Sequence, residues 1–254
     1  MKSMINISNT FRNSLKKVAI PLSSNIHTKS KINISDTIRN RLKKGVFPFL
    51  ANDNIAAHLL PGEMDALEIE VKNKVQDLLN TMVIDTENDH NTRDTAERIS
   101  RMYLHEIFKG RYQPAPKITD FPNAKNFNDI YTVGPITVRS TCSHHLVPIT
   151  GNCWIGVKPS DRVIGLSKFN RLVDWIMARP QIQEEATVML ADTIENLIKP
   201  QGLAVILKAQ HNCMSWRGVK DNNTNMITSV MRGSFQHNNE SRQELMNILR
   251  GQGF

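Results

Sequence analysis

The order of apolar patterns between residues 130 and 235 restricts the fold of this chain more than any other feature of its sequence. Two strand-like segments come first, two helical segments follow, and two further strand-like segments complete the series, at 130–138, 151–157, 167–178, 183–198, 203–209 and 225–235. Strands that follow one another in pairs join most simply as antiparallel neighbours, and two adjacent helices need a sheet to cover. We therefore predict an α+β fold with a largely antiparallel sheet.

Helical patterns also precede this series, and one follows it. The apolar spacing predicts helices over residues 62–82, 96–110 and 241–249. A loop rich in proline and asparagine, residues 111–129, separates the first two helices from the strands. We expect residues 63–110 to form an N-terminal helical layer beside a core of residues 130–250.

Charge divides the chain into two parts. The 254 residues carry a formal net charge of +8. Residues 1–60 contain ten Lys or Arg and only two acidic residues, so the rest of the chain is neutral overall. This basic quarter is also duplicated, because residues 5–25 and 32–52 are identical at 12 of 21 positions. Two copies are too few to stack as a solenoid. We therefore expect residues 1–60 to be a weakly ordered extension of a domain formed by residues 61–254.

Composition also bears on the class of protein. No apolar run approaches the roughly 18 residues that a membrane-spanning helix needs. Three cysteines are too few for a disulfide framework, so we expect a cytoplasmic protein. The basic, acid-poor start of the chain leaves an organelle-targeting segment or a docking arm as alternatives. Nucleic acid is not an expected partner, because the basic segment lacks interleaved aromatic residues that could stack on bases.

Cysteine and histidine residues gather in two short segments. The segment TCSHHL contains Cys142, His144 and His145, and HNC, further along the chain, contains His211 and Cys213. A Cys-x-x-His pair can bind one metal ion from a tight loop, and three protein ligands with an open fourth position are typical of a catalytic zinc site. On spacing alone, buried cysteines with hydrogen-bonded histidines explain the same pattern equally well.

Five segments, taken in order, resemble the core motifs of GTP cyclohydrolase I. They are DTAERISRMYLHEIFKG, TCSHHLVPITG, VIGLSKFNRLVDW, RPQIQEE and HNCMSWRGV, and the similarity extends over about residues 63–250. The resemblance implies a tunnelling fold (T-fold), with two helices on one face of the sheet, whose subunits assemble into a toroidal barrel. It implies a homo-oligomer, in this family usually a decamer, with active sites at subunit interfaces. The implied reaction is the zinc-dependent hydrolysis of GTP to formate and 7,8-dihydroneopterin triphosphate.

The resemblance also implies roles for individual residues. The implied Zn²⁺ ligands are Cys142, His145 and Cys213, and the implied acid–base residues are His144 and His211. The implied guanine contacts are Gln183 and Glu184. The implied contacts to ribose and triphosphate are Ser167, Lys168, Arg171 and Arg217, together with Arg98 reaching a neighbouring subunit's phosphates.

These residue types suit that chemistry. A bound zinc ion lowers the pKa of water toward about 7, and a histidine can protonate guanine N7 near neutral pH. The carboxylate of Glu184 can accept hydrogen bonds from guanine N1–H and the exocyclic amine together, a donor pair that adenine lacks. Lys168 and Arg171 are three residues apart, so they share a face near the start of a helix, where anions are favoured. Ser167 is a candidate cap for this helix.

One position departs from the family pattern, and other functions stay open. Ser143 stands where the family usually has a glutamate, which puts the rate and the pH optimum in question but not metal binding. One alternative is a non-catalytic or regulatory T-fold protein that binds a pterin or GTP. Another is a related nitrile reductase, which would need a nucleophilic cysteine and a nicotinamide cofactor rather than this ligand set. The same GTP hydrolysis can begin tetrahydrofolate or deazaguanine nucleoside biosynthesis.

Overall fold

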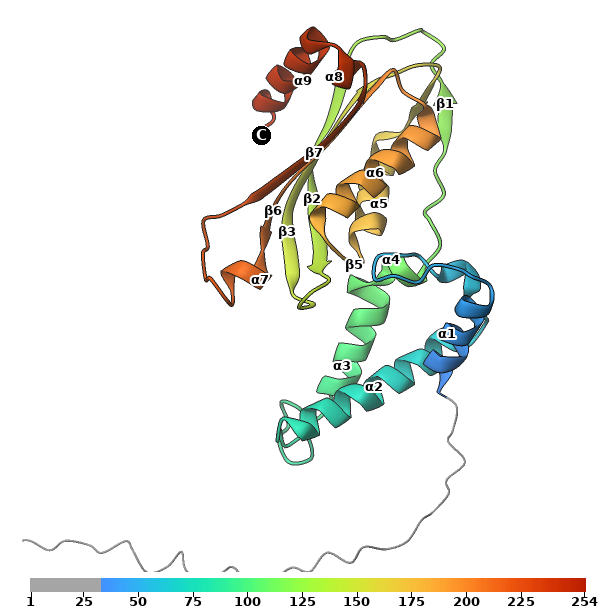
Figure 1. Cartoon of the computed structure of the whole chain (residues 1–254), viewed down its shortest axis with the longest axis vertical. Coiled ribbons are helices and arrows are strands. Elements are labelled where there is room, and N and C mark those ends of the chain that lie inside the picture. Colours follow the sequence, from blue (N-terminus) through green and yellow to red (C-terminus); the bar gives the residue numbers. More distant parts are fainter. Residues whose placement is uncertain (1–32) are drawn as a thin grey trace, which may run out of the picture. The chain divides into compact units, whose positions relative to one another are not determined.

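The computed structural model describes residues 33–254, which form one compact unit around a five-stranded sheet. The strand order is β5-β2-β3-β6-β7, as Figure 1 shows. The strands are β2 (Tyr131–Cys142), β3 (Pro148–Lys158), β5 (Pro180–Gln181), β6 (Gly202–His211) and β7 (Met226–Gly233). All neighbouring strands are antiparallel except β5, which runs parallel to the end of β2. The predicted α+β fold with a largely antiparallel sheet is confirmed.

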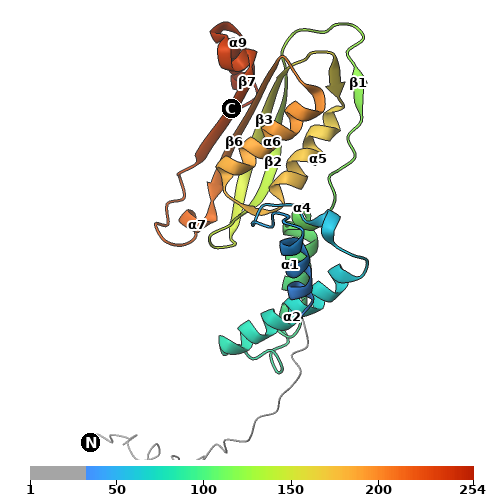
Figure 2. The same ribbon diagram turned by 45° about the vertical axis from the view of Figure 1, so that its right-hand side comes forward.

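Alternation along the strands builds the main hydrophobic core on one face of this sheet. Cys153, Ile155 and Val157 of β3 are fully buried there, because every second residue of a strand points to the same face. The helices α5 (Leu166–Met177) and α6 (Gln183–Ile198) cover this face with their apolar sides, and both were predicted close to these bounds. Figure 2 shows the two helices beside each other in front of the strands.

The opposite face of the sheet is covered by the C-terminal residues. Trp154, Ala204 and Ile206 point to this face and pack against α8 (Ser234–His237) and α9 (Asn239–Gly251). The predicted final helix is therefore present, and it gives the sheet a second cover in addition to α5 and α6. The physical reason is that β3 and β6 are apolar on both faces, so a cover on one face alone would leave Trp154 in water.

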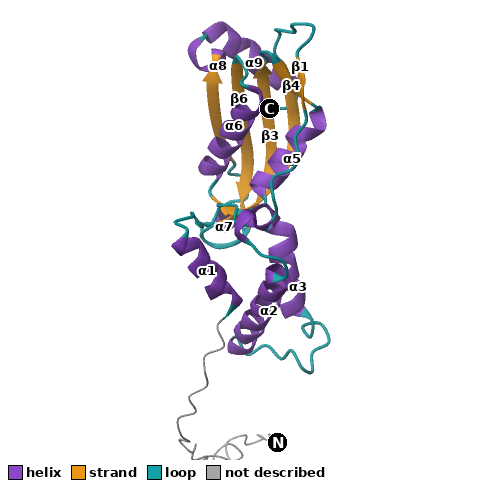
Figure 3. Ribbon diagram, turned by 90° about the vertical axis from the view of Figure 1, so that its right-hand side faces the viewer, coloured by secondary structure: helices purple, strands orange, loops and turns teal. Residues whose placement is uncertain are grey.

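The helical layer before the sheet contains α2 (Glu63–Thr81) and α3 (Thr95–Arg101), which pack on each other (Figure 3). The second predicted helix is divided into α3, a π-helical segment η2 (Met102–Ile107) and α4 (Lys109–Tyr112). Gly110 N donates a hydrogen bond to the Ala178 carbonyl oxygen at 3.0 Å. A Cβ atom at Gly110 would lie 1.9 Å from the Trp175 carbonyl oxygen, so only glycine allows this close contact between α4 and α5.

The second copy of the repeat is folded, which corrects the predicted boundary at residue 60. Its residues form α1 (Ile34–Lys44), and η1 (Ala56–His58) follows. Ile38 and Leu42 of α1 are buried with Ile55 in a small separate core. The net charge misled the prediction, because Arg39, Lys43 and Lys44 of α1 are exposed and Arg41 pairs with Glu63, while the apolar stripe of the helix is packed. The first copy, residues 5–25, lies outside the described residues.

Two smaller features differ from the sequence-based expectations. β1 (Asp120–Pro122) lies in the region predicted as loop and pairs with β4 (Arg162–Ile164). Gly165 is the N-cap of α5, so the prediction that Ser167 caps this helix is wrong. Within residues 33–254, no helix combines the length and the apolar character needed to cross a bilayer.

Candidate metal centre

The strand register brings the two cysteine-containing segments to one end of the sheet. Cys142 is the last residue of β2, and β3 follows after a tight turn. On the other side of β3, Ile149 pairs with His211, the last residue of β6. Cys213 comes next, in the short helix α7 (Asn212–Ser215). Segments distant in sequence therefore meet because β3 pairs with both β2 and β6.

Cys142, His145 and Cys213 have their ligand atoms within 4.8 Å of one another, so the structure brings the three predicted metal ligands together. Cys142 is buried and Cys213 is half-buried. The pKa of the Cys213 thiol is raised, first because burial disfavours the thiolate and then because Cys142 lies beside it. Two sulfur donors and an imidazole suit zinc, and a bound cation favours the thiolate forms that burial disfavours.

The turn between β2 and β3 presents His144 and His145. Leu146 N donates to the Cys142 carbonyl oxygen at 2.9 Å, and Leu146 takes a left-handed conformation with φ of 52°. Ser143 N donates to the Gln181 carbonyl oxygen at 3.2 Å, which ties the turn to β5. His144 Nδ1 lies 3.8 Å from Cys142 Sγ, so this second ring also borders the ligand cluster.

His211 is held by an amide from the start of α6. Its Nε2 lies 2.8 Å from Gln183 Oε1. An amide oxygen only accepts, so Nε2 carries the proton in this contact. The pKa of His211 is lowered, chiefly because burial disfavours the imidazolium, while the nearby charge of Glu184 acts in the opposite direction. The neutral imidazole is therefore the favoured form.

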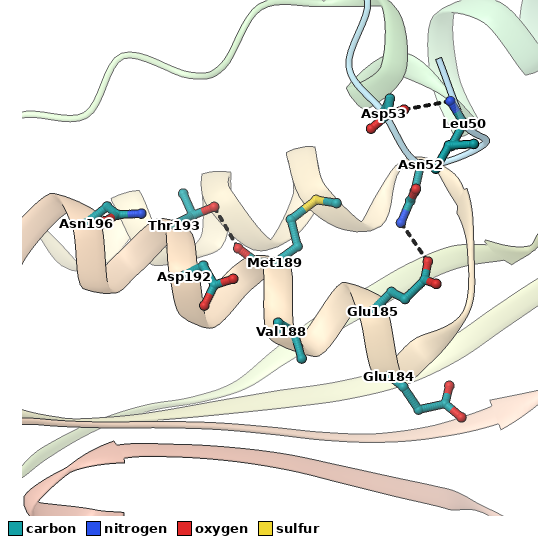
Figure 4. Close-up of a pocket in the computed structure, with 10 residues that line it drawn as sticks. All are labelled: Leu50, Asn52, Asp53, Glu184, Glu185, Val188, Met189, Asp192, Thr193 and Asn196. Atoms are coloured by element: carbon teal, nitrogen blue, oxygen red, sulfur yellow. Dashed lines mark hydrogen bonds between the residues drawn. The ribbon is translucent and has the colours of Figure 1, made fainter. Parts of the chain in front are cut away.

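Gln183 and Glu184 differ in what they offer to a ligand. Gln183 is 4% exposed, and its Nε2 donates to the Leu207 and Met226 carbonyl oxygens and to Thr228 Oγ1 at 3.0–3.2 Å. Its amide is therefore fully engaged by the protein. Glu184 is exposed at the first turn of α6, and Figure 4 shows its carboxylate pointing away from that of Glu185.

The predicted anion-binding residues do not all reach this end of the sheet. Arg217 does, because its Nη1 donates to His145 Nε2 at 2.8 Å. A guanidinium only donates, so this nitrogen can serve either Arg217 or a metal ion, but not both. Arg98 lies in α3, where it forms a surface ion pair with Asp94 at 3.3 Å.

Ser167 and Lys168 lie in the first turn of α5, whose other end adjoins Gln181 beside Cys142, and Arg171 lies about one turn further along the helix. The neighbouring residue Phe169 packs against Tyr131, with ring centroids 6.4 Å apart. Tyr131 begins β2 and Cys142 ends it, and a strand of that length spans roughly 35 Å. Within one chain, Ser167 and Lys168 are therefore not part of the cysteine and histidine cluster.

The buried guanidinium of Arg179 was not predicted from the sequence, although Arg179 begins the segment RPQIQEE. Arg179 is 2% exposed and lies over the Trp175 ring, 4.2 Å from its centroid. It precedes the short strand that leads to Gln183 and Glu184. An arginine between an amphipathic helix and a proline carries no periodic signal of burial, so only the structure reveals it.

Two comparisons by sequence agree on one family. The family model described as GTP cyclohydrolase I matches residues 71–250. The GTP cyclohydrolase 1 of Haemophilus ducreyi is 34% identical over 191 residues, covering 75% of this chain and 87% of that protein. The protein of the same name from an Enterobacter species is 39% identical over 163 residues, covering 64% of this chain and 73% of its own.

Among solved structures, the archaeosine synthase QueF-Like in its apo form superposes on part of the chain. The TM-score is 0.33 at 14% sequence identity, with 47% of this chain and 97% of that chain covered.

Proposed function

The chain belongs to the GTP cyclohydrolase I family, and from that premise we propose that it hydrolyses GTP to formate and 7,8-dihydroneopterin triphosphate. One observation carries this proposal: the three candidate metal ligands, His211 and the exposed carboxylate of Glu184 converge at one end of the sheet. This reaction would be the first step of tetrahydrofolate biosynthesis.

We propose that Cys142, His145 and Cys213 hold a zinc ion. The donor set supports this, because two sulfurs and one imidazole within 4.8 Å leave a fourth position open. When bound, such an ion supplies Lewis acidity that makes water a competent nucleophile at neutral pH. His144 and His211 border the same cluster, and we assign them the proton transfers that opening the imidazole ring of guanine requires.

Glu184 is proposed to read the guanine edge. Its carboxylate is exposed at the start of α6 and lies close enough to His211 to affect the pKa of that ring. Gln183 is proposed not to contact guanine, because its amide is already hydrogen-bonded to His211 and to the strands. In this arrangement Gln183 orients the histidine, and Glu184 contacts the substrate.

The formation of formate with and without metal tests the activity. We expect the metal-loaded protein to release one formate per GTP, and a chelator to abolish this release. The Cys213→Ala variant is expected to lose bound zinc and turnover together, whereas Cys153→Ala should retain both, because Cys153 is fully buried in the core. Metal-loaded protein that binds GTP but releases no formate would favour a non-catalytic binding protein instead.

We further propose a homo-oligomer in which each active site takes residues from more than one subunit. The separation of Lys168 from the cysteines within the chain supports this, because a triphosphate needs cations beside the reacting guanine. Co-assembling inactive Cys213→Ala and Lys168→Ala subunits should recover activity that neither variant has alone. A mixture of Cys213→Ala with Cys142→Ala serves as the control and should stay inactive. Equal inactivity of both mixtures would show that one chain supplies the whole site.

A further inference from the structure

The loop of residues 49–54, at the end of the second repeat copy, is held in one conformation by many contacts. The guanidinium of Arg111 donates to the carbonyl oxygens of Phe49, Leu50, Ala51 and Asp53. Asn54 Nδ2 donates to the carbonyl oxygens of Gly110 and Gln113 at 2.8 and 2.6 Å. An irregular segment with so many of its carbonyl groups bonded is a rigid part of the structure.

Arg179 joins this 49–54 loop to the segment that leads into α6. Its Nη1 donates to the Asn52 carbonyl oxygen at 2.9 Å. Burial lowers the pKa of Arg179 to about 10, although the charge of Asp53 acts in the opposite direction. Among the described residues, Nε and Nη2 of Arg179 have no hydrogen-bond partner. The hydrogen bond to the Asn52 carbonyl oxygen therefore offsets much of the free-energy cost of burying this cation.

The Asn52 side chain contacts α6 directly. Its Nδ2 donates to Glu185 Oε2 at 2.9 Å, and Figure 4 shows the two side chains pointing toward each other across the gap between loop and helix. Asn52, Glu184 and Glu185 also line a cavity of about 640 Å³. Both carboxylates border open space, so packing does not fix them, whereas a hydrogen bond to a charged oxygen can.

We propose that Asn52 is a positioning residue for guanine recognition. By holding Glu185 on the loop side of α6, Asn52 keeps that carboxylate away from Glu184, which stays free to accept the guanine donors. The backbone bond from Arg179 to Asn52 fixes the loop relative to the same turn of α6. This inference rests on the proposed function, because it acts through the guanine contact of Glu184.

The selectivity between GTP and inosine triphosphate tests this role in the full-length, metal-loaded protein. Inosine triphosphate keeps N1–H but lacks the exocyclic amine, so the ratio of the two kcat/KM values reports on how well Glu184 is placed. Asn52→Asp sets two carboxylates against each other and should lower this ratio about tenfold. In the double variant Asn52→Asp with Glu185→Gln, the glutamine donates and the aspartate accepts, the reverse of the wild-type hydrogen bond. This variant should recover the wild-type ratio of kcat/KM values.

Two controls separate this role from folding. Asn196→Ala, which lines the same cavity further along α6, should leave the ratio unchanged. Asn52→Ala, with its Tm measured in parallel, should lower the ratio even if Asn52→Asp folds poorly. A general loss of stability would reduce turnover of both nucleotides equally and would leave the ratio intact.

The outcomes are distinguishable from failure of the proposed function. Glu184→Ala should abolish the preference for GTP. If it does so while the Asn52 variants keep the wild-type ratio, the positioning role is overturned and guanine recognition by Glu184 stands. If Glu184→Ala keeps the preference, guanine is read elsewhere and both proposals are overturned.

Discussion

A single amide, that of Gln183, organises much of the candidate site. It accepts from His211 and donates to two carbonyl groups and Thr228, and Thr187 Oγ1 lies 2.7 Å from the same threonine hydroxyl. Each partner restricts the rotation of the amide, so its oxygen stays directed at the histidine. The proton on His211 Nε2 is thereby held at a defined atom.

Gln183→Ala is expected to lower kcat by roughly ten- to a hundredfold and to change KM for GTP little. Orientation by a neighbouring group contributes about this much, and the Gln183 amide does not face the ligand. Steady-state kinetics on the metal-loaded variant measure both constants. A large rise in KM with kcat unchanged would instead place Gln183 in contact with guanine.

At the scale of residues, the sequence was most informative about side chains that belong to recognisable motifs. Cys142, His145 and Cys213 were predicted from their motifs, and they lie together. The contacts of Arg179 and Asn52 were not predictable, because they join positions 127 residues apart and depend on loop geometry. The separation of Lys168 from the cysteines was equally hidden, since a motif does not state which end of a sheet it occupies.

Among the structural elements, β3 has the central place, because it forms pairs along its length with both β2 and β6. Gly151 of β3 lies opposite Ala209, two residues before His211. A Cβ atom at Gly151 would lie 2.1 Å from the Lys208 carbonyl oxygen and 2.6 Å from Ala209 Cα. These are backbone atoms, so a side chain can be accommodated only by moving β6 away from β3.

Gly151→Ala is therefore expected to destabilise the protein by about 1–3 kcal/mol and to weaken metal binding as well. The two effects should appear together, because the same strand pairing places Cys213 beside Cys142. Urea unfolding and competition with a metal-binding dye measure them. Gly251→Ala in α9 is the control, because no atom of residues 33–254 would lie within 4 Å of the added carbon, and it should not lose stability or zinc affinity. Normal stability and zinc affinity of Gly151→Ala would contradict the pairing.

The anchor of α1 predicts a dependence of stability on pH. The Arg41 guanidinium forms an ion pair with Glu63 and lowers the pKa of that carboxyl. A carboxyl with a lowered pKa in the folded state stabilises the protein above its unfolded pKa near 4.5, and this contribution is lost as pH falls through the lower folded value.

Arg41→Ala should lower the Tm by about 2–4 °C at pH 7, and the difference from wild type should shrink below pH 4.5. Thermal melts at a series of pH values provide the measurement. Arg39→Ala is the matched control, because among the described residues Arg39 forms its ion pair with Asp36 of the same helix, where both side chains are about half exposed. A Tm difference that does not change with pH would mean that Arg41 acts through packing rather than through Glu63.

Elements were predicted well where the apolar period was long and uniform, as in α6 and β6. The division of the second helix at η2 was not predicted, because a π-helical segment of six residues is too short to show a period of its own within a longer helical pattern. The fold of α1 was missed for another reason. It has only two buried residues, Ile38 and Leu42, and more charged ones, so its apolar pattern is weak. The residues that pack against them lie in separate segments, at Ile55 and Tyr112.

For the molecule as a whole, the unit that the structure describes begins at Asn33 and includes α1. A protein beginning at Asn33 should match the full chain in Tm and in kcat/KM for GTP. One beginning at Pro61 loses α1 and the 49–54 loop, which uncovers Tyr112 and leaves Arg179 without its carbonyl partner. Its Tm should fall by at least about 5 °C. Equal melting of the two shortened proteins, measured by differential scanning fluorimetry, would show that α1 is dispensable.

The strand register has a consequence for how a newly made chain reaches its native state. A slip of one residue between β3 and β6 would turn every side chain of β6 to the opposite face, and the two cysteine sulfurs would then no longer meet. A zinc ion that needs both sulfurs would bind only the chain whose pairing is correct, and its binding energy would be added to that arrangement alone. Metal binding would thus select the correct strand register during folding, before any substrate binds.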